Sequence, residues 1–88
     1  MTRTEQIRQC LERAFEPVAL EVIDESHKHI GHPGARDGRG HFRVRIVSSA
    51  FQGKASLQRH RMVYDAVGSL MQTDIHALSV DARTEEEA

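Results

Sequence analysis

The stretch HFRVRIVS, which runs from His41 to Ser48, alternates its apolar and polar side chains with a period of two. Such alternation is typical of a β-strand that buries one face and exposes the other. The expected buried side chains are Phe42, Val44 and Ile46, and the expected exposed ones are His41, Arg43, Arg45 and Val47. A strand of this kind needs helices to cover its apolar face, and the flanking sequence predicts two of them.

On the N-terminal side, the sequence predicts a helix followed by a strand. An amphipathic pattern covers residues 2–15, where Thr2 and Glu5 have the spacing of a capping box. Pro17 is expected to end this helix. Its apolar stripe consists of Ile7, Cys10, Leu11, Ala14 and Phe15. Alternation over Leu20–Asp24 then predicts a strand.

On the C-terminal side, the sequence predicts a turn, a second helix and a third strand. The helix is expected over Ser56–Gln72 because apolar residues recur there at helical spacing. Its stripe consists of Leu57, His60, Val63, Tyr64, Val67, Leu70 and Met71. The third strand is expected over Ile75–Ala82, with His76 on the same apolar face as Leu78 and Val80.

The predicted order is αββαβ, which defines an α+β fold. A strand–helix–strand unit favours a right-handed crossover to a parallel neighbour, so we expect a three-stranded mixed sheet with both helices on one face. This topology is similar to that of class II K-homology (KH) domains. We expect a single domain over residues 1–88, with a core at about 3–81 and a frayed tail at 82–88.

Composition restricts the classes of protein. No apolar run approaches the roughly 20 residues that a membrane span needs, and the N-terminus lacks a signal-peptide core, so we expect a cytoplasmic protein without membrane contact. The one cysteine, Cys10, fits a reducing compartment and a structural role on the first helix. Residues 28–61 carry eight basic side chains against Asp37 alone, a local charge of +7 in a chain of net charge −1. An anionic partner for this middle segment stays open.

The sequence contains six histidines, and His27, His29 and His32 fall in the glycine-rich segment between the first two strands. Three explanations are open: solvated imidazoles of a polar loop, metal ligation, and catalysis. Neutral imidazole suits Zn, Cu, Fe and Ni, but HKHIGH matches no closed zinc signature and HExxH is absent. No nucleophile–base pair can be named, so we do not expect an enzyme.

The other three histidines have structural interpretations at this point. His41 opens the central strand on its exposed face. His60 lies on the stripe of the second helix, where a half-buried, hydrogen-bonded imidazole is expected. His76 begins the third strand at its edge, and it gains interest only if the segment with His29 folds back towards it.

A nucleic-acid function has a weaker signal. KH domains grip RNA with a GXXG loop between two helices, whereas the only GXXG here, GHPG at residues 31–34, lies between two strands. Duplex DNA stays open as a partner through basic residues near the start of the second helix. The candidate contact residues are Lys54, Arg59, His60 and Arg61.

Four blocks of the sequence, VIDESHKHIGH, HFRVRIVSSAFQGK, LQRHRMVYDAV and IHALSV, resemble the BolA family in order and spacing. The resemblance runs from about Leu20 to Asp81, and its most specific parts are the FxGKxxxxRHRxVY block at Phe51–Tyr64 and the HALS block at His76–Ser79. It implies the KH-like αββαβ fold. It also implies partnership with a monothiol glutaredoxin, in which glutaredoxin and glutathione supply thiolates to a shared, bridging [2Fe-2S] cluster.

The resemblance implies two ligands on this chain. The invariant histidine of the family corresponds to His76, and the loop ligand corresponds to His29 by its distance from the ES pair. Because the loop has no cysteine, we expect the subfamily with a loop histidine, and His27 and His32 stay open as alternative ligands. Without suitable thiols, the chain alone is expected to hold no cluster stably, and to be a monomer or weak homodimer when free.

The resemblance therefore implies two functions. The first is an iron–sulfur adaptor, active in cluster trafficking or iron regulation. The alternative, which the resemblance also implies, is a DNA-binding transcriptional regulator with effects on cell shape and stress responses.

Overall fold

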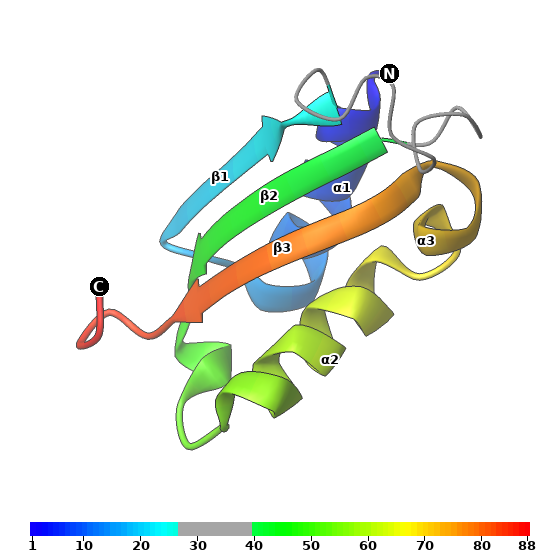
Figure 1. Cartoon of the computed structure of the whole chain (residues 1–88). Coiled ribbons are helices and arrows are strands. Elements are labelled where there is room, and N and C mark those ends of the chain that lie inside the picture. Colours follow the sequence, from blue (N-terminus) through cyan, green and yellow to red (C-terminus); the bar gives the residue numbers. More distant parts are fainter. Residues whose placement is uncertain (27–39) are drawn as a thin grey trace.

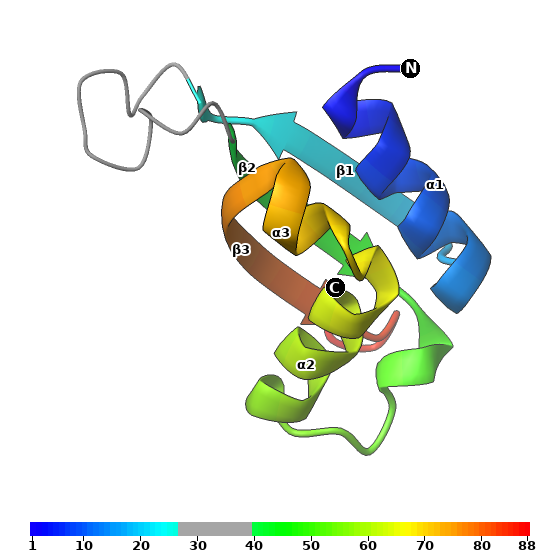
Figure 2. The ribbon, with the colours of Figure 1, turned by 90° about the vertical axis from the view of Figure 1, so that its right-hand side faces the viewer.

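The computed structural model describes residues 1–26 and 40–88, which form a sheet with helices on one of its faces (Figures 1 and 2). The sheet contains β1 (Ala19–Asp24), β2 (Gly40–Val47) and β3 (Ile75–Arg83), in the order β1-β2-β3. β1 is antiparallel to β2, and β2 is parallel to β3. The helical elements are α1 (Arg3–Phe15), the 3-10 turn η3 (Ser49–Phe51), α2 (Ser56–Val67) and α3 (Leu70–Thr73). The predicted α+β class and mixed three-stranded sheet are confirmed.

The ends of α1 follow from its capping residues. The Thr2 hydroxyl accepts a hydrogen bond from the Glu5 backbone N–H at 3.1 Å and donates to the Glu5 carboxylate at 3.2 Å. At the other end, Glu16 adopts the left-handed conformation with φ 45°, which leads the chain out of the helix before Pro17. The predicted bounds of this helix are therefore confirmed, although Ala14 is exposed rather than part of the buried stripe.

The core lies between β2 and the helices. Phe42, Val44 and Ile46 are buried as predicted, and they pack with residues of α1, α2 and β3. The fully assembled core consists of Ile7, Leu11, Phe42, Val44, Ile46, Phe51, Val63, Val67, Ile75 and Leu78. The buried Ser48 hydroxyl donates to the Phe15 carbonyl at 2.7 Å, which joins the end of β2 to the end of α1. The buried hydroxyl beside η3 therefore has a hydrogen-bond partner, as buried polar groups usually do.

The predicted helix over Ser56–Gln72 is wrong at its C-terminal end. α2 stops at Val67, because Gly68 takes φ 54° and ψ −124°, a conformation that residues with a side chain rarely adopt. The chain then changes direction, and Leu70–Thr73 forms the separate turn α3. A glycine inside a helical pattern is compatible with continuation or with a stop, and the tertiary structure selects the stop.

The predicted stripe of the second helix is too wide. Val63 and Val67 are buried, but Leu57 is 60% exposed and Tyr64 is 39% exposed. At about 100° per residue, Leu57 lies about a third of a turn away from Val63 on the helix surface. Tyr64 lies at the edge of the buried face, where its hydroxyl donates to the Leu78 carbonyl at 3.1 Å.

The C-terminal residues make specific contacts. β3 continues to Arg83, and the following turn is held by a hydrogen bond from the Glu87 N–H to the Thr84 carbonyl at 3.1 Å. Ala82 and Arg83 belong to β3, and the frayed tail expected over 82–88 stays a prediction. Within residues 1–26 and 40–88, none of the helices has the length and apolar character that crossing a membrane requires.

Candidate functional site

A β-bulge at the start of β3 positions His76. Gly40 pairs with Ile75, but His41 pairs with Ala77, so His76 is an extra residue between two consecutive pairs of the ladder. Ile75 and Leu78 are both buried, whereas His76 is exposed. The prediction that His76 shares the apolar face of Leu78 and Val80 is therefore wrong, because the bulge turns its side chain to the opposite face.

The same bulge brings His76 beside His41. The centroids of the two imidazole rings are 5.1 Å apart, with an interplanar angle of 42°. His41 lies on the exposed face of β2, as predicted, and its backbone N–H donates to the Ser26 hydroxyl at 3.1 Å. Sequence reasoning placed these histidines on different faces, so it missed the pair.

Backbone contacts fix this end of the sheet. The Gly40 N–H donates to the Asp74 carbonyl at 2.9 Å, and the Glu25 N–H donates to the His41 carbonyl at 2.8 Å. A hydrogen bond from the Thr73 hydroxyl, followed by one from Arg3, lowers the pKa of Asp74. The turn before His76 is thereby linked to α1 as well as to β2.

Three of the predicted ligands, His27, His29 and His32, lie outside the described residues. Among residues 1–26 and 40–88, no group of three or more His, Cys, Asp or Glu side chains could hold a metal ion. Cys10 is half-buried on α1 and packs against the core, in the helical layer rather than on the face that carries His41 and His76. A metal bound at His76 would need further ligands from residues 27–39 or from a partner.

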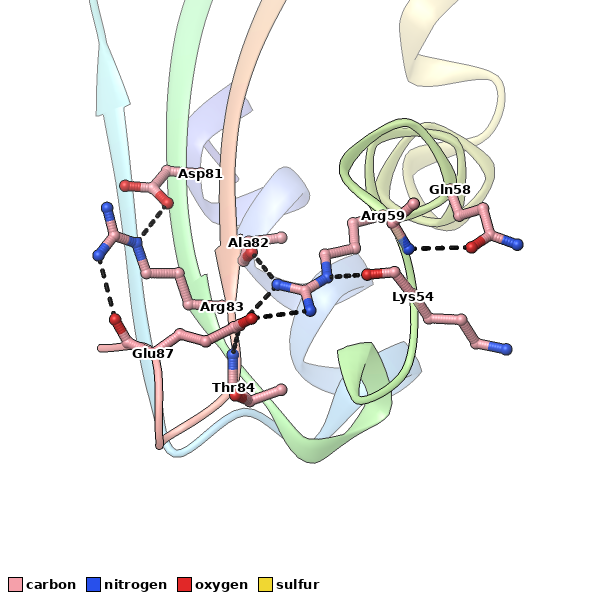
Figure 3. A network of polar contacts seen from close by, with 9 residues as sticks. Lys54, Gln58, Arg59, Asp81, Ala82, Arg83, Thr84 and Glu87 are labelled. Carbon is pink, nitrogen blue, oxygen red and sulfur yellow. Dashed lines mark hydrogen bonds and ion pairs between the residues drawn. The ribbon is translucent and has the colours of Figure 1, made fainter.

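The predicted DNA or partner contacts at the start of α2 separate into two kinds. Lys54 and Arg61 are exposed, and His60 is half-buried. The Arg59 side chain is only 12% exposed, because its guanidinium is enclosed by other groups of the chain. Its Nε donates to the Lys54 carbonyl at 2.8 Å and one Nη1 hydrogen bond goes to the Ala82 carbonyl at 2.9 Å (Figure 3).

The remaining contacts of Arg59 are with the C-terminal turn. Its Nη1 and Nη2 atoms donate to the two carboxylate oxygens of Glu87 at 2.6 and 3.1 Å (Figure 3). The Thr84 N–H also donates to this carboxylate, at 2.8 Å. The hydrogen bond from Arg59, followed by that from Thr84, lowers the pKa of Glu87 to about 2. Sequence reasoning missed Glu87, since no local pattern links residues 28 positions apart.

The αββαβ order, the mixed sheet and the single helical layer define an α+β domain of the class II KH-like type. The chain belongs to the BolA-like protein family, whose model matches residues 11–87. The family resemblance found in the sequence is therefore confirmed.

Three relatives illustrate the match. SufE-like protein 1 of Arabidopsis thaliana, chloroplastic/mitochondrial, is 46% identical over 94% of this chain, which spans only 24% of the length of that protein. The solved BolA domain of SufE1 from Arabidopsis thaliana covers 100% of this chain and 98% of its own, with 43% identity and a TM-score of 0.88. The DNA-binding transcriptional regulator BolA of Escherichia coli is 41% identical over 91% of this chain and 73% of its own.

Proposed function

We propose that this protein is an iron–sulfur adaptor of the loop-histidine subfamily, which shares a bridging [2Fe-2S] cluster with a monothiol glutaredoxin and glutathione. The observation that carries the proposal is the position of His76, exposed at a bulge on the face of the sheet opposite the helices. An exposed imidazole at the end of a fixed strand is accessible to a second protein. We also propose that the protein shares this cluster in the cytoplasm. A single cysteine is compatible with such a reducing compartment.

The surroundings of His76 support a second ligand from residues 27–39. Ser26 and Gly40, which flank this segment, both lie beside His41: Ser26 by its hydrogen bond and Gly40 as the preceding residue. His29 is three residues beyond Ser26 in the sequence, and a fully extended chain of three residues spans at most about 11 Å, at roughly 3.3–3.6 Å per residue. His27 is within reach as well, so the choice of His29 over its neighbours rests on the family resemblance.

The ligand chemistry supports a shared cluster rather than one held by this chain alone. Clusters of this type are held by thiolates, and imidazole replaces thiolate on one iron in Rieske centres. Cys10 lies in the helical layer, away from the face of His76. The chain's own residues would therefore provide imidazole ligands, while glutaredoxin and glutathione would provide the thiolates.

Co-expression with a monothiol glutaredoxin tests this proposal. The purified wild-type complex should show the visible absorption of a [2Fe-2S] cluster, and His76→Ala should lose that spectrum while its circular dichroism stays unchanged. His60→Ala is the matched control, because it removes a half-buried imidazole at a distance from the bulge. A wild-type spectrum from the His76→Ala complex would contradict the ligand assignment.

A variant of His41 distinguishes two roles for this residue, as a ligand of the cluster or as a neighbour that orients His76. His41 lies 5.1 Å from His76 between ring centroids, so it orients the neighbouring imidazole or competes with it as a ligand. If it supports His76, His41→Ala should weaken or shift the cluster spectrum without abolishing it. Complete loss in His41→Ala together with retention in His29→Ala would instead assign the second ligand to β2.

The name of the Escherichia coli relative supports a second candidate function, that of a DNA-binding regulator. We propose Lys54 and Arg61 as its contact residues, because both are exposed. If Arg61 contacts a phosphate, Arg61→Gln should reduce the slope of log affinity against log salt by about 1, and the exposed Arg13→Gln on α1 should not. Equal slopes for the two variants would contradict this function of α2.

A further inference from the structure

A cavity of about 400 Å³ opens between the start of α2 and the end of β3, whereas His76 is at the start of that strand. It is lined by Lys54, Ser56, Arg59, His60, Val80, Asp81, Ala82, Arg83 and Glu87. Its lining includes neither His41 nor His76, so it is separate from the proposed cluster site. Its most enclosed charged group is the Arg59 guanidinium, which is 12% exposed.

The guanidinium is held so that its Nη1 and Nη2 edge faces Glu87, another residue that lines the cavity. Carbonyl groups of Lys54 and Ala82 accept hydrogen bonds from Nε and Nη1, and these bonds fix the plane of the group. The remaining Nη1 and Nη2 hydrogens point in parallel, and the Glu87 carboxylate accepts both (Figure 3). A fixed pair of parallel N–H donors matches two oxygens of a carboxylate or a phosphate.

Glu87 is an internal occupant of this site, and it is held less firmly than Arg59. Its side chain is 46% exposed and belongs to a short turn beyond the last strand, whereas Arg59 belongs to α2. The turn is tied down mainly through Glu87 itself and through the bond from Arg83 to the Glu87 carbonyl at 3.2 Å. Displacement of this turn would uncover the donors without disturbing the sheet or α2.

The charges around the cavity favour a dianion over a second carboxylate. Lys54, Arg59 and Arg83 are cationic and Asp81 and Glu87 anionic, which leaves a net +1 with Glu87 in place and +2 without it. Asp81 and Arg83 already neutralise each other at 2.8 Å. The exposed Lys54 side chain points away from Glu87 (Figure 3), so this carboxylate does not neutralise its ammonium, which together with Arg59 carries the excess charge.

We propose that this cavity binds the dianionic phosphate group of a small molecule, and that Glu87 is an internal competitor which occupies the site until such a ligand displaces the C-terminal turn. The apparent affinity for phosphate is then the intrinsic affinity reduced by the fraction of molecules whose turn is displaced. If Glu87 occupies the site in about nine molecules of ten, its removal raises the apparent affinity about tenfold.

The test is a titration with inorganic phosphate, at constant ionic strength and at a pH well above the second pKa of inorganic phosphate, where the dianion predominates, followed by amide NMR shifts. Glu87→Ala should bind phosphate about tenfold more tightly than wild type. Glu86→Ala is the matched control, since it removes an exposed carboxylate from the same turn without touching Arg59. Equal phosphate affinities for Glu87→Ala and Glu86→Ala would overturn the proposal.

Two further measurements identify the donor and the ligand. Arg59→Lys in the Glu87→Ala background keeps the charge but loses the parallel donors, so phosphate binding should fall back at least to the wild-type affinity. Thermal melting of this double variant checks that its fold is retained; if it does not fold, Lys54→Gln, which leaves Arg59 in place, should weaken phosphate binding instead. Stronger binding of a DNA duplex than of inorganic phosphate by Glu87→Ala would overturn the small-molecule assignment.

Discussion

At the scale of single residues, Gly40 shows how closely the chain approaches itself beside the two histidines. A Cβ at this position would lie 2.7 Å from the Ser26 hydroxyl oxygen, 2.7 Å from Cε2 of Phe42 and 2.9 Å from its Cζ. These distances are shorter than real carbon contacts, so only glycine fits between the ring and the hydroxyl. The fixed position of Gly40 also fixes the start of β2 and therefore His41.

We predict that Gly40→Ala destabilises the protein by about 1–3 kcal/mol, the usual cost of overpacking a core. Chemical denaturation measures this difference in the free energy of unfolding. Phe42→Leu, which removes the clashing ring atoms, is combined with it in a double-mutant cycle. The two changes should be non-additive by at least about 0.5 kcal/mol, and simple additivity would mean that the ring does not restrict position 40.

The residue scale is also where prediction from sequence was weakest. Alternation placed His41 correctly, because β2 pairs regularly along most of its length. It placed His76 on the wrong face, because the bulge depends on how β3 pairs with β2, which the local sequence of β3 does not contain. The same reason explains why Glu87 was missed, since its contact with Arg59 depends on the packing of β3 beside α2.

At the scale of elements, periodicity located an element wherever its apolar residues follow the period of the face that packs on the core. It predicted α1, β1 and β2 to within a residue or two, although Leu20 and Val22 on the apolar face of β1 are only half-buried. It failed in α2, where apolar residues extend around the helix beyond the buried face. Leu57 and Val67 belonged to one predicted stripe, yet Leu57 is 60% exposed and Val67 is 3% exposed.

This contrast gives a direct test of the α2 packing. Val67→Asp places an unpaired charge in the core, which should cost several kcal/mol and unfold so small a domain. Leu57→Asp is the matched control, and it should change the free energy of unfolding by no more than about 0.5 kcal/mol because the residue is exposed. Thermal melts of both variants check the prediction, and similar melting temperatures would mean that α2 is rotated from the described orientation.

At the scale of the whole molecule, the two sites lie at opposite ends of the sheet. His76 is near the start of β3, whereas Ala82 and Arg83, which line the cavity, are at its end. A strand rises about 3.3 Å per residue, so these sites are separated by roughly 20 Å. The proposed partner at His76 and the proposed ligand at Arg59 would therefore contact different ends of the sheet.

The contact between Arg59 and Glu87 also makes the stability of the protein depend on pH. Because the pKa of Glu87 is lowered to about 2 from its ordinary 4.5, its contribution to stability is fully present above about pH 4.5 and is lost as pH falls through 2. Wild type should therefore exceed Glu87→Ala in thermal stability at pH 5, and the difference should shrink towards pH 2. A difference that stays constant over this range would show that the carboxylate is not held by Arg59.

The bulge at His76 has a consequence for chain length. If His76 were deleted, Ile75 would still face Gly40 and Ala77 would still face His41, so that β2 and β3 would form an uninterrupted ladder with the same core residues. β3 therefore contains one residue more than its pairing with β2 requires. Bulges persist where they aim a side chain, and the surplus residue here is a histidine. A chain without this residue would keep the pairs and the core of the sheet, but it would lose the histidine on which the proposed partnership depends.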